Sequence, residues 1–136
     1  MPEYPQLLHT VLDTTKPREL AVFYRELLNL RYRPGDEPPA DGTRDDADWL
    51  VLVDEAGGRR LAFQLVDRLT HTTWPHHAVP MQLHVDFTVS STEELERQRE
   101  RAVDLGARVI LDRTDVSEEP LYVFADPSGH PFCIFV

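Results

Sequence analysis

Hydrophobic and polar residues follow two rhythms along this chain, one helical and one strand-like, and the same order of rhythms occurs twice. Between residues 18 and 28, apolar side chains recur at helical spacing, and Pro17 stands where a first helical turn tolerates proline. The stripe consists of Leu20, Phe23, Tyr24, Leu27 and Leu28. The pattern predicts a helix over residues 18–28, preceded by a strand that begins with residues 8–11.

A second helix is predicted over residues 92–105, after a strand at 82–89. Ser91 is followed three residues later by Glu94, as in a capping box, and Gly106 is a typical C-terminal stop. The apolar stripe of this helix is thinner than that of the first and consists of Leu95, Ala102 and Leu105.

Each half ends in two strand-like runs joined by residues typical of turns. Residues 54–58 separate the runs 49–54 and 61–66, and residues 126–129 separate the runs 121–126 and 131–136. Both halves therefore read β-α-β-β-β. We predict an α+β fold of one domain over residues 1–136, with module one at 5–66, a linker at 67–80 and module two at 81–136.

Two irregular segments interrupt this order. The linker carries prolines at 75 and 80 and three histidines, His71, His76 and His77, which we interpret as exposed loop residues because no regular element fixes their geometry. Residues 34–48 are rich in proline, glycine and aspartate and predict a mobile rim over a pocket.

Alternation along the strands gathers unusual polar side chains on one side of the predicted sheets. Side chains two apart share a face, so one set of each strand is apolar and the other carries the polar residues. The polar set consists of His9, Gln64, His84, Asp86 and Cys133. These types differ from the lysines, glutamates and threonines of a wetted face and favour a cavity. Histidines that only hydrogen-bond within the sheet are the alternative.

Composition excludes several classes of protein. The 136 residues, 41% of them hydrophobic, suffice for one core, and a formal charge of −10 disfavours nucleic acid and anionic lipid as partners. The single cysteine cannot form an intramolecular disulfide. The apolar runs are only strand-sized, so we expect no membrane span and a cytoplasmic protein.

Several strings resemble the vicinal-oxygen-chelate superfamily, which includes glyoxalase I, bleomycin-resistance proteins and extradiol dioxygenases. The strings are LLHTV at 7–11, FYRELL at 23–28, HVD at 84–86 and DPSGHPF at 126–132. The likeness covers nearly the whole chain, and TWP at 73–75 with GHPFC at 129–133 is most similar to a glyoxalase-like subgroup. The resemblance implies two βαβββ modules forming an open barrel, a small-molecule ligand and a homodimer.

The resemblance also implies a metal site built from the first and last strand of each module. The matching positions are His9, Gln64, His84 and Cys133, of which His9, Gln64 and His84 could hold nickel, zinc or iron. Cys133 departs from the family's carboxylate and is more typical of a small buried hydrophobe. Asp86 is then the nearby carboxylate that could act as a catalytic base or orient an imidazole.

Three functions remain open from the sequence. A metal-free binding protein suits the missing carboxylate, and aromatic walls could come from Trp49, Trp74, Tyr32 and Tyr122. A metal-dependent lyase or isomerase of the glyoxalase I type is the alternative, with Asp86 as base. An extradiol dioxygenase ranks third, because Gln64 stands where glutamate is expected. The sequence assigns no reaction.

Overall fold

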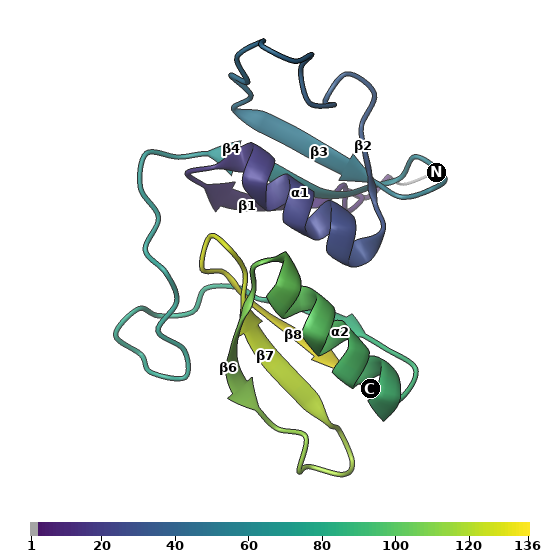
Figure 1. The fold of residues 1–136 in the computed structure, drawn as a ribbon, viewed down its shortest axis with the longest axis vertical. Coiled ribbons are helices and arrows are strands. Elements are labelled where there is room, and N and C mark those ends of the chain that lie inside the picture. Colours follow the sequence, from purple (N-terminus) through teal and green to yellow (C-terminus); the bar gives the residue numbers. More distant parts are fainter. Residues whose placement is uncertain (1–2) are drawn as a thin grey trace. The chain divides into compact units, whose positions relative to one another are not determined.

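The computed structural model of the protein describes residues 3–136 and divides the chain into two compact units, unit 1 up to Asp67 and unit 2 from Arg68 to Val136 (Figure 1). Unit 1 contains β1 (Thr10–Thr14), α1 (Pro17–Leu28), β2 (Arg31–Tyr32), β3 (Trp49–Val53) and β4 (Arg59–Leu65). Unit 2 contains β5 (Val85–Thr88), α2 (Thr92–Leu105), β6 (Arg108–Asp112), β7 (Leu121–Ala125) and β8 (Pro131–Phe135). The predicted α+β fold with two βαβββ modules is confirmed.

Each unit holds one open four-stranded sheet with the same topology. The strand orders are β1-β4-β3-β2 in unit 1 and β5-β8-β7-β6 in unit 2. In both, the first strand runs parallel to the last, and the remaining pairs are antiparallel. The first and last strands of a unit are therefore neighbours, although most of the unit's sequence separates them.

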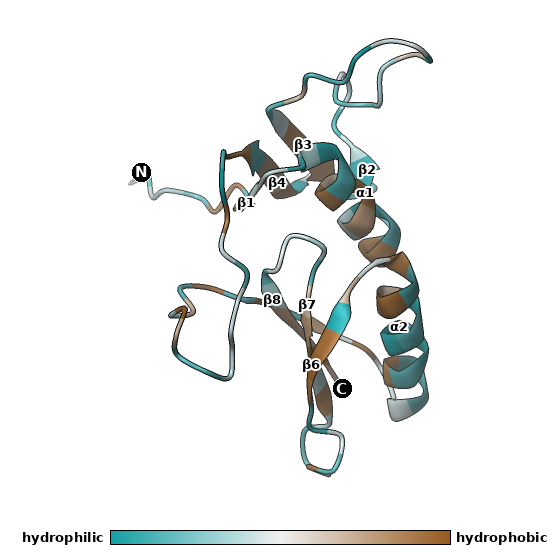
Figure 2. Cartoon of the chain, turned by 60° about the vertical axis from the view of Figure 1, so that its left-hand side comes forward, coloured by the Kyte–Doolittle hydropathy of each residue, from teal (hydrophilic) through white to brown (hydrophobic). Residues whose placement is uncertain are grey.

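Both helices bury one stripe against their own sheet. In α1, Leu20, Phe23 and Tyr24 are almost fully buried, and burying each such side chain contributes roughly 1.5–3 kcal/mol. Apolar and polar positions alternate along both helices (Figure 2). Neither α1 nor α2, the helices found between residues 3 and 136, is long and apolar enough to cross a membrane.

The ends of α2 follow their predicted chemistry. The Ser91 hydroxyl accepts a hydrogen bond from the Glu94 N–H at 3.1 Å, and Gly106 ends the helix at φ +121°. Only Leu95 and Ala102 of this helix are buried. An aromatic layer in the sheet, with Phe124 and Phe132 stacked at 4.9 Å, supplies the core that the thin helical stripe does not.

The first strand of each unit begins later than the sequence predicts. β1 starts at Thr10 and β5 at Val85, so His9 and His84 directly precede the paired strands instead of lying within them. Val85 pairs with Phe132. The residue before Phe132 is Pro131, which has no N–H with which the ladder could extend toward His84.

The first part of the predicted linker is hydrogen-bonded to a turn of unit 2. The turns of residues 54–58 and 126–130 share one design, in which the aspartate carboxylate accepts two backbone N–H groups. The second turn also binds residues 71–72: Thr72 N–H donates to the Gly129 carbonyl at 3.0 Å, and the His71 ring lies against Gly129. Gly129 therefore lies where two backbone segments approach each other closely.

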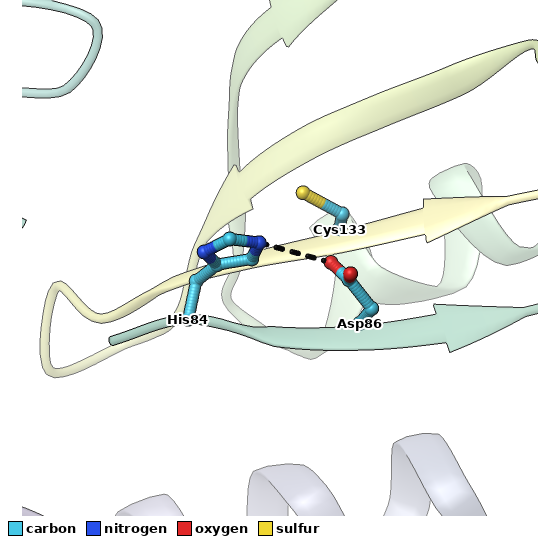
Figure 3. A group of neighbouring side chains, drawn as sticks. All are labelled: His84, Asp86 and Cys133. Carbon is cyan, nitrogen blue, oxygen red and sulfur yellow. Dashed lines mark ion pairs between the residues drawn. The ribbon is translucent and has the colours of Figure 1, made fainter.

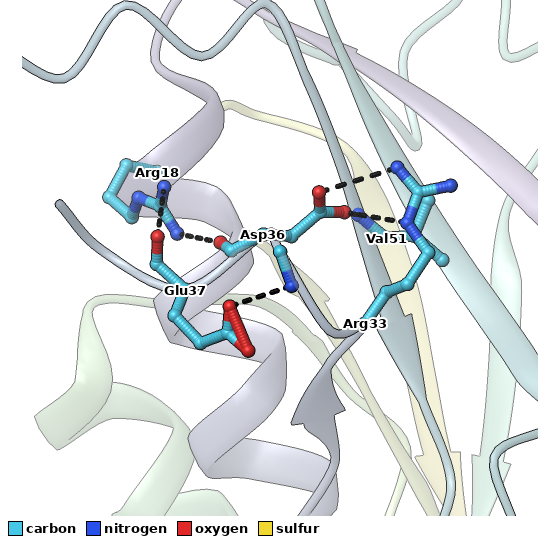
Figure 4. Close-up of polar contacts among 6 residues, drawn as sticks. Arg18, Arg33, Asp36, Glu37 and Val51 are labelled. Carbon is cyan, nitrogen blue, oxygen red and sulfur yellow. Dashed lines mark hydrogen bonds and ion pairs between the residues drawn. The ribbon is translucent and has the colours of Figure 1, made fainter.

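The segment of residues 34–48 is held to α1 by one arginine (Figure 4). Arg18 donates to the Asp45 carboxylate at 2.7 Å, to the Asp36 carbonyl at 2.7 Å and to the Glu37 carbonyl at 3.4 Å. Its guanidinium also lies 5.0 Å from the ring centre of Tyr32. The segment predicted as a mobile rim is therefore anchored at several points along its length.

Candidate functional site

Three side chains with metal-binding and proton-transfer chemistry meet in unit 2: His84, Asp86 and Cys133, here called the donor cluster (Figure 3). Asp86 of β5 stands directly opposite Cys133 of β8, and His84 lies two residues before Asp86, next to the strand's start. One ligand atom from each residue lies within 4.8 Å of the others. The parallel pairing of β5 and β8 brings these three side chains together.

Within the donor cluster, His84 and Asp86 form a close pair. Nε2 of His84 lies 3.2 Å from a carboxylate oxygen of Asp86, and the two side chains are 39% and 50% exposed. Nε2 faces this carboxylate, and Nδ1 is the ring nitrogen that points away from it (Figure 3). The pair therefore presents an imidazole ring and a carboxylate to the solvent.

Cys133 is a protonated thiol in this setting. Burial, followed by the charge and the hydrogen bond of Asp86, raises the pKa of Cys133 to about 11. Both causes act in the same direction, because a thiolate is disfavoured by desolvation and by a neighbouring negative charge. Without a cation beside it, the thiol is a weak nucleophile at neutral pH.

Tyr122, predicted as a wall of the ligand pocket, lies on the sheet face that carries α2. Tyr122 pairs with Ile134 on the opposite sheet face from Val123 and Cys133, and its hydroxyl bonds to Glu96 of α2 at 2.5 Å. Burial and Glu96 together raise the pKa of Tyr122 to about 12. Its ring and hydroxyl therefore join the helix to the sheet. Tyr32 likewise pairs with Leu52 and lies beside Arg18 of α1.

In unit 1, the predicted residues His9, Trp49 and Gln64 gather on the sheet face away from α1. Trp49 stands opposite Gln64, and the ring centres of His9 and Trp49 are 5.8 Å apart. Burial, then the charges of Arg59 and Arg33, lower the pKa of His9, which keeps the ring neutral. Its Nδ1 is buried and has no hydrogen-bond partner within the described residues 3–136.

The registers of the first and last strands relate positions of unit 1 to positions of unit 2. Val11 stands opposite Ala62 in unit 1, as Asp86 stands opposite Cys133 in unit 2. His9 and His84 each stand two residues before those positions. The hairpins agree with this match, since Val51 stands opposite Ala62 as Val123 stands opposite Cys133. The counterpart of Cys133, however, is Ala62 and not Gln64, which stands opposite Asp13.

The two units are therefore chemically unequal. Ala62 offers no ligand atom, and it is fully buried with Val51 and Val53 under the partly buried Trp49. Unit 1 presents an imidazole beside an indole, whereas unit 2 presents an imidazole, a carboxylate and a thiol.

Two further features of the chain lie apart from the donor cluster. Trp74, predicted as a pocket wall, lies outside the strands, where its backbone N–H donates to the Thr72 hydroxyl at 3.1 Å. In unit 1, an open groove of about 610 Å³ lies between the start of α1 and residues 44–47. Its charged groups already pair with one another, as Arg18 does with Asp45 and Arg44 with Asp46, and it contains none of the predicted site residues.

Comparison with family models identifies the protein family of this chain. A family model described as a glyoxalase-like domain matches residues 9–135. No curated protein matches the chain.

Solved structures share the fold at low sequence identity. A protein from Bacillus cereus described as a possible glyoxalase is 17% identical, with a TM-score of 0.64 over 96% of this chain and 98% of that one. A glyoxalase/bleomycin resistance protein/dioxygenase family enzyme from Burkholderia phytofirmans PsJN is 14% identical, with a TM-score of 0.67 and coverages of 94% and 95%. A mutant of the fosfomycin resistance protein FosX from Listeria monocytogenes, complexed with Mn(II) and 1S,2S-dihydroxypropylphosphonic acid, is 21% identical, with a TM-score of 0.67 and coverages of 97% and 92%.

Proposed function

Since the chain belongs to the glyoxalase-like domain family of the vicinal-oxygen-chelate superfamily, we propose that it binds a small organic molecule through the donor cluster of unit 2. The observation that carries the proposal is the His84–Asp86 pair at 3.2 Å, with both side chains about half exposed. An accessible imidazole held by a carboxylate can accept a hydrogen bond from a ligand hydroxyl or move its proton.

The chemistry of the donor cluster indicates which molecules suit it. A ligand with two neighbouring hydroxyl groups can donate one hydrogen bond to Nδ1 of His84 and one to the Asp86 carboxylate at once. The formal charge of −10 favours neutral or cationic molecules over polyanions. The FosX variant was solved with a dihydroxy compound, which supports vicinal oxygens as the feature to test first.

The binding proposal predicts that His84 responds to ligands and that a distant histidine does not. We expect a panel of catechols, α-hydroxy ketones and cationic aromatic compounds to yield a binder that shifts the imidazole NMR signals of His84. His84→Ala should weaken that binding at least about tenfold, the scale of one lost hydrogen bond whose partner stays unsatisfied. His77→Ala, an exposed histidine of the same unit, is the matched control. A panel that leaves the His84 signals unmoved would overturn the proposal.

A metal-dependent lyase or isomerase of the glyoxalase I type is the second candidate. It is favoured by one observation: Asp86 lies with His84 and Cys133 within 4.8 Å. The donor cluster therefore contains a carboxylate, which the ligand set predicted from the sequence did not. A divalent ion bound there would polarise a substrate oxygen as a Lewis acid. His84, Asp86 and Cys133 would hold the ion, and Asp86 would also hold or move a proton of the substrate.

The second candidate predicts isomerase activity on the methylglyoxal–glutathione adduct after addition of nickel or zinc. Asp86→Asn should lower kcat at least about 100-fold, since general acid–base groups contribute about 10²–10⁴. Asp104→Asn, an exposed aspartate of α2, is the control. Inactivity of metal-loaded wild-type protein would exclude this candidate and leave ligand binding untouched.

The proposal places the protein in the cytoplasm as a homodimer. The family resemblance supports this proposal. The acidic composition supports small molecules rather than nucleic acid as partners.

A further inference from the structure

We propose that His84, Asp86 and Cys133 form a complete three-ligand site for a zinc-like ion inside unit 2, with Asp86 as a ligand in its own right. The inference deepens the metal-dependent form of the proposed function and rests on it. It departs from the sequence prediction, in which the ligands were His9, Gln64 and His84.

The separations in the donor cluster are close to those that a tetrahedral ion requires. Bonds of 2.0–2.3 Å at tetrahedral angles place neighbouring ligand atoms about 3.3–3.6 Å apart. Nε2 of His84 and the Asp86 oxygen are already 3.2 Å apart, and no pair of the three ligand atoms exceeds 4.8 Å. The remaining closure is on the order of 1 Å, which rotation of the Cys133 side chain can supply.

The backbone holds these ligands in place before any ion arrives. Asp86 and Cys133 are direct partners on hydrogen-bonded parallel strands, and His84 precedes β5 by a single residue. Ligands on paired strands lose little conformational freedom on binding, so the site is preorganised. The half-exposed side chains of His84 and Asp86 give an ion access from solvent.

The donor types select the metal. A thiolate prefers zinc or cobalt to manganese or magnesium, and imidazole and carboxylate accept the same borderline ions. When the ion binds, the Cys133 sulfur exchanges its proton for the metal, and the proton leaves to solvent. Three protein ligands leave a fourth position open, the arrangement of catalytic zinc sites.

Unit 1 supplies the contrast that makes the inference testable. The register counterpart of Cys133 is Ala62, which has no ligand atom, and Trp49 packs against it. If unit 2 holds the ion alone, His9 is dispensable for metal binding although it is equivalent to His84.

The test is a titration of the untagged full-length chain with Co(II), Zn(II) and Mn(II). We expect one Co(II) per chain with a thiolate-to-cobalt charge-transfer absorption, and binding of Zn(II) at least about 100-fold tighter than Mn(II). Cys133→Ser should abolish that absorption, and His84→Ala or Asp86→Asn should weaken cobalt binding at least about tenfold. His9→Ala and His77→Ala should bind cobalt as the wild type does, and circular dichroism verifies that each variant is folded.

Several outcomes would overturn the inference. These are no stoichiometric cobalt binding by folded wild-type protein, bound cobalt without the thiolate absorption, an unaffected Asp86→Asn variant, or a loss in His9→Ala that equals the loss in His84→Ala. Because the readout is absorption and metal content, it is independent of any organic ligand. A protein that binds zinc here but moves no His84 signal with the ligand panel would retain the metal site and lose the binding proposal.

Discussion

Replacing Gly129 with alanine is expected to destabilise the protein by about 2–5 kcal/mol, the sum of a left-handed backbone cost and an overpacking cost. The residue has φ +89°, and an added Cβ would lie 2.4 Å from Cγ and 2.8 Å from Cβ of His71. Rotation of the His71 ring cannot relieve the contact with its own Cβ. The backbone of residues 71–72 must therefore move and lose the Thr72–Gly129 hydrogen bond.

The other unit provides the matched control for this substitution. Gly57 occupies the corresponding turn at φ +86°, but nothing lies within 4 Å of its would-be Cβ. Gly57→Ala should therefore cost only the backbone part, about 1–2 kcal/mol. Urea unfolding of both variants measures the difference. Equal losses of stability in the two variants would show that the contact with His71 contributes nothing. If the contact does destabilise Gly129→Ala, adding His71→Gly to that variant should recover part of the lost stability.

Alkylation of Cys133 by iodoacetamide at pH 8 should be about 20- to 200-fold slower than that of a cysteine in an unstructured peptide. A thiol with a pKa of about 11 has far less thiolate at this pH than one with an ordinary pKa near 8.5. The greater intrinsic nucleophilicity of the more basic thiolate returns part of the difference. The rate should keep rising through pH 9–11, where the peptide's rate has levelled off.

Asp86 identifies the cause of the slow alkylation. Its charge and hydrogen bond both raise the pKa of Cys133, so Asp86→Asn should lower that pKa and speed alkylation at pH 8 several-fold. Asp104→Asn should leave the rate unchanged. Quantified mass spectrometry of the alkylated chain gives the rates, and an Asp86→Asn variant that reacts no faster would assign the effect to burial alone.

The repeat and both helices were predictable because their signals are local. The helix of residues 92–105 is bounded by Ser91 and Gly106, whose capping roles depend only on nearby backbone. The first strands were less predictable, because a strand begins where its partner can pair. His9 and His84 fall just outside that limit, a fact set by residues more than forty positions away.

The candidate site was predictable in its members but not in its grouping. His84, Asp86 and Cys133 share a face by alternation, yet their meeting depends on the β5–β8 register. Gln64 was matched to Cys133 through the family resemblance. Alternation could not detect the difference, because a shift of two residues along a strand keeps the same face. Tyr122 shows the reverse case: alternation within β7 separates it from Val123, but the sheet face that α2 covers is settled only by packing.

The contacts of Arg18 bear on how this protein can change over evolution. Much of the anchoring of residues 34–48 comes from one guanidinium that binds two backbone carbonyls and one carboxylate, with Asp36 also accepting the Val51 N–H. Backbone carbonyls are present whatever the side chain, so the contacts of Arg18 fix no side chain between Glu37 and Asp45, and extra residues can loop out between the anchor points. A lineage that keeps Arg18 can therefore remodel this segment while the sheet of unit 1 keeps its register.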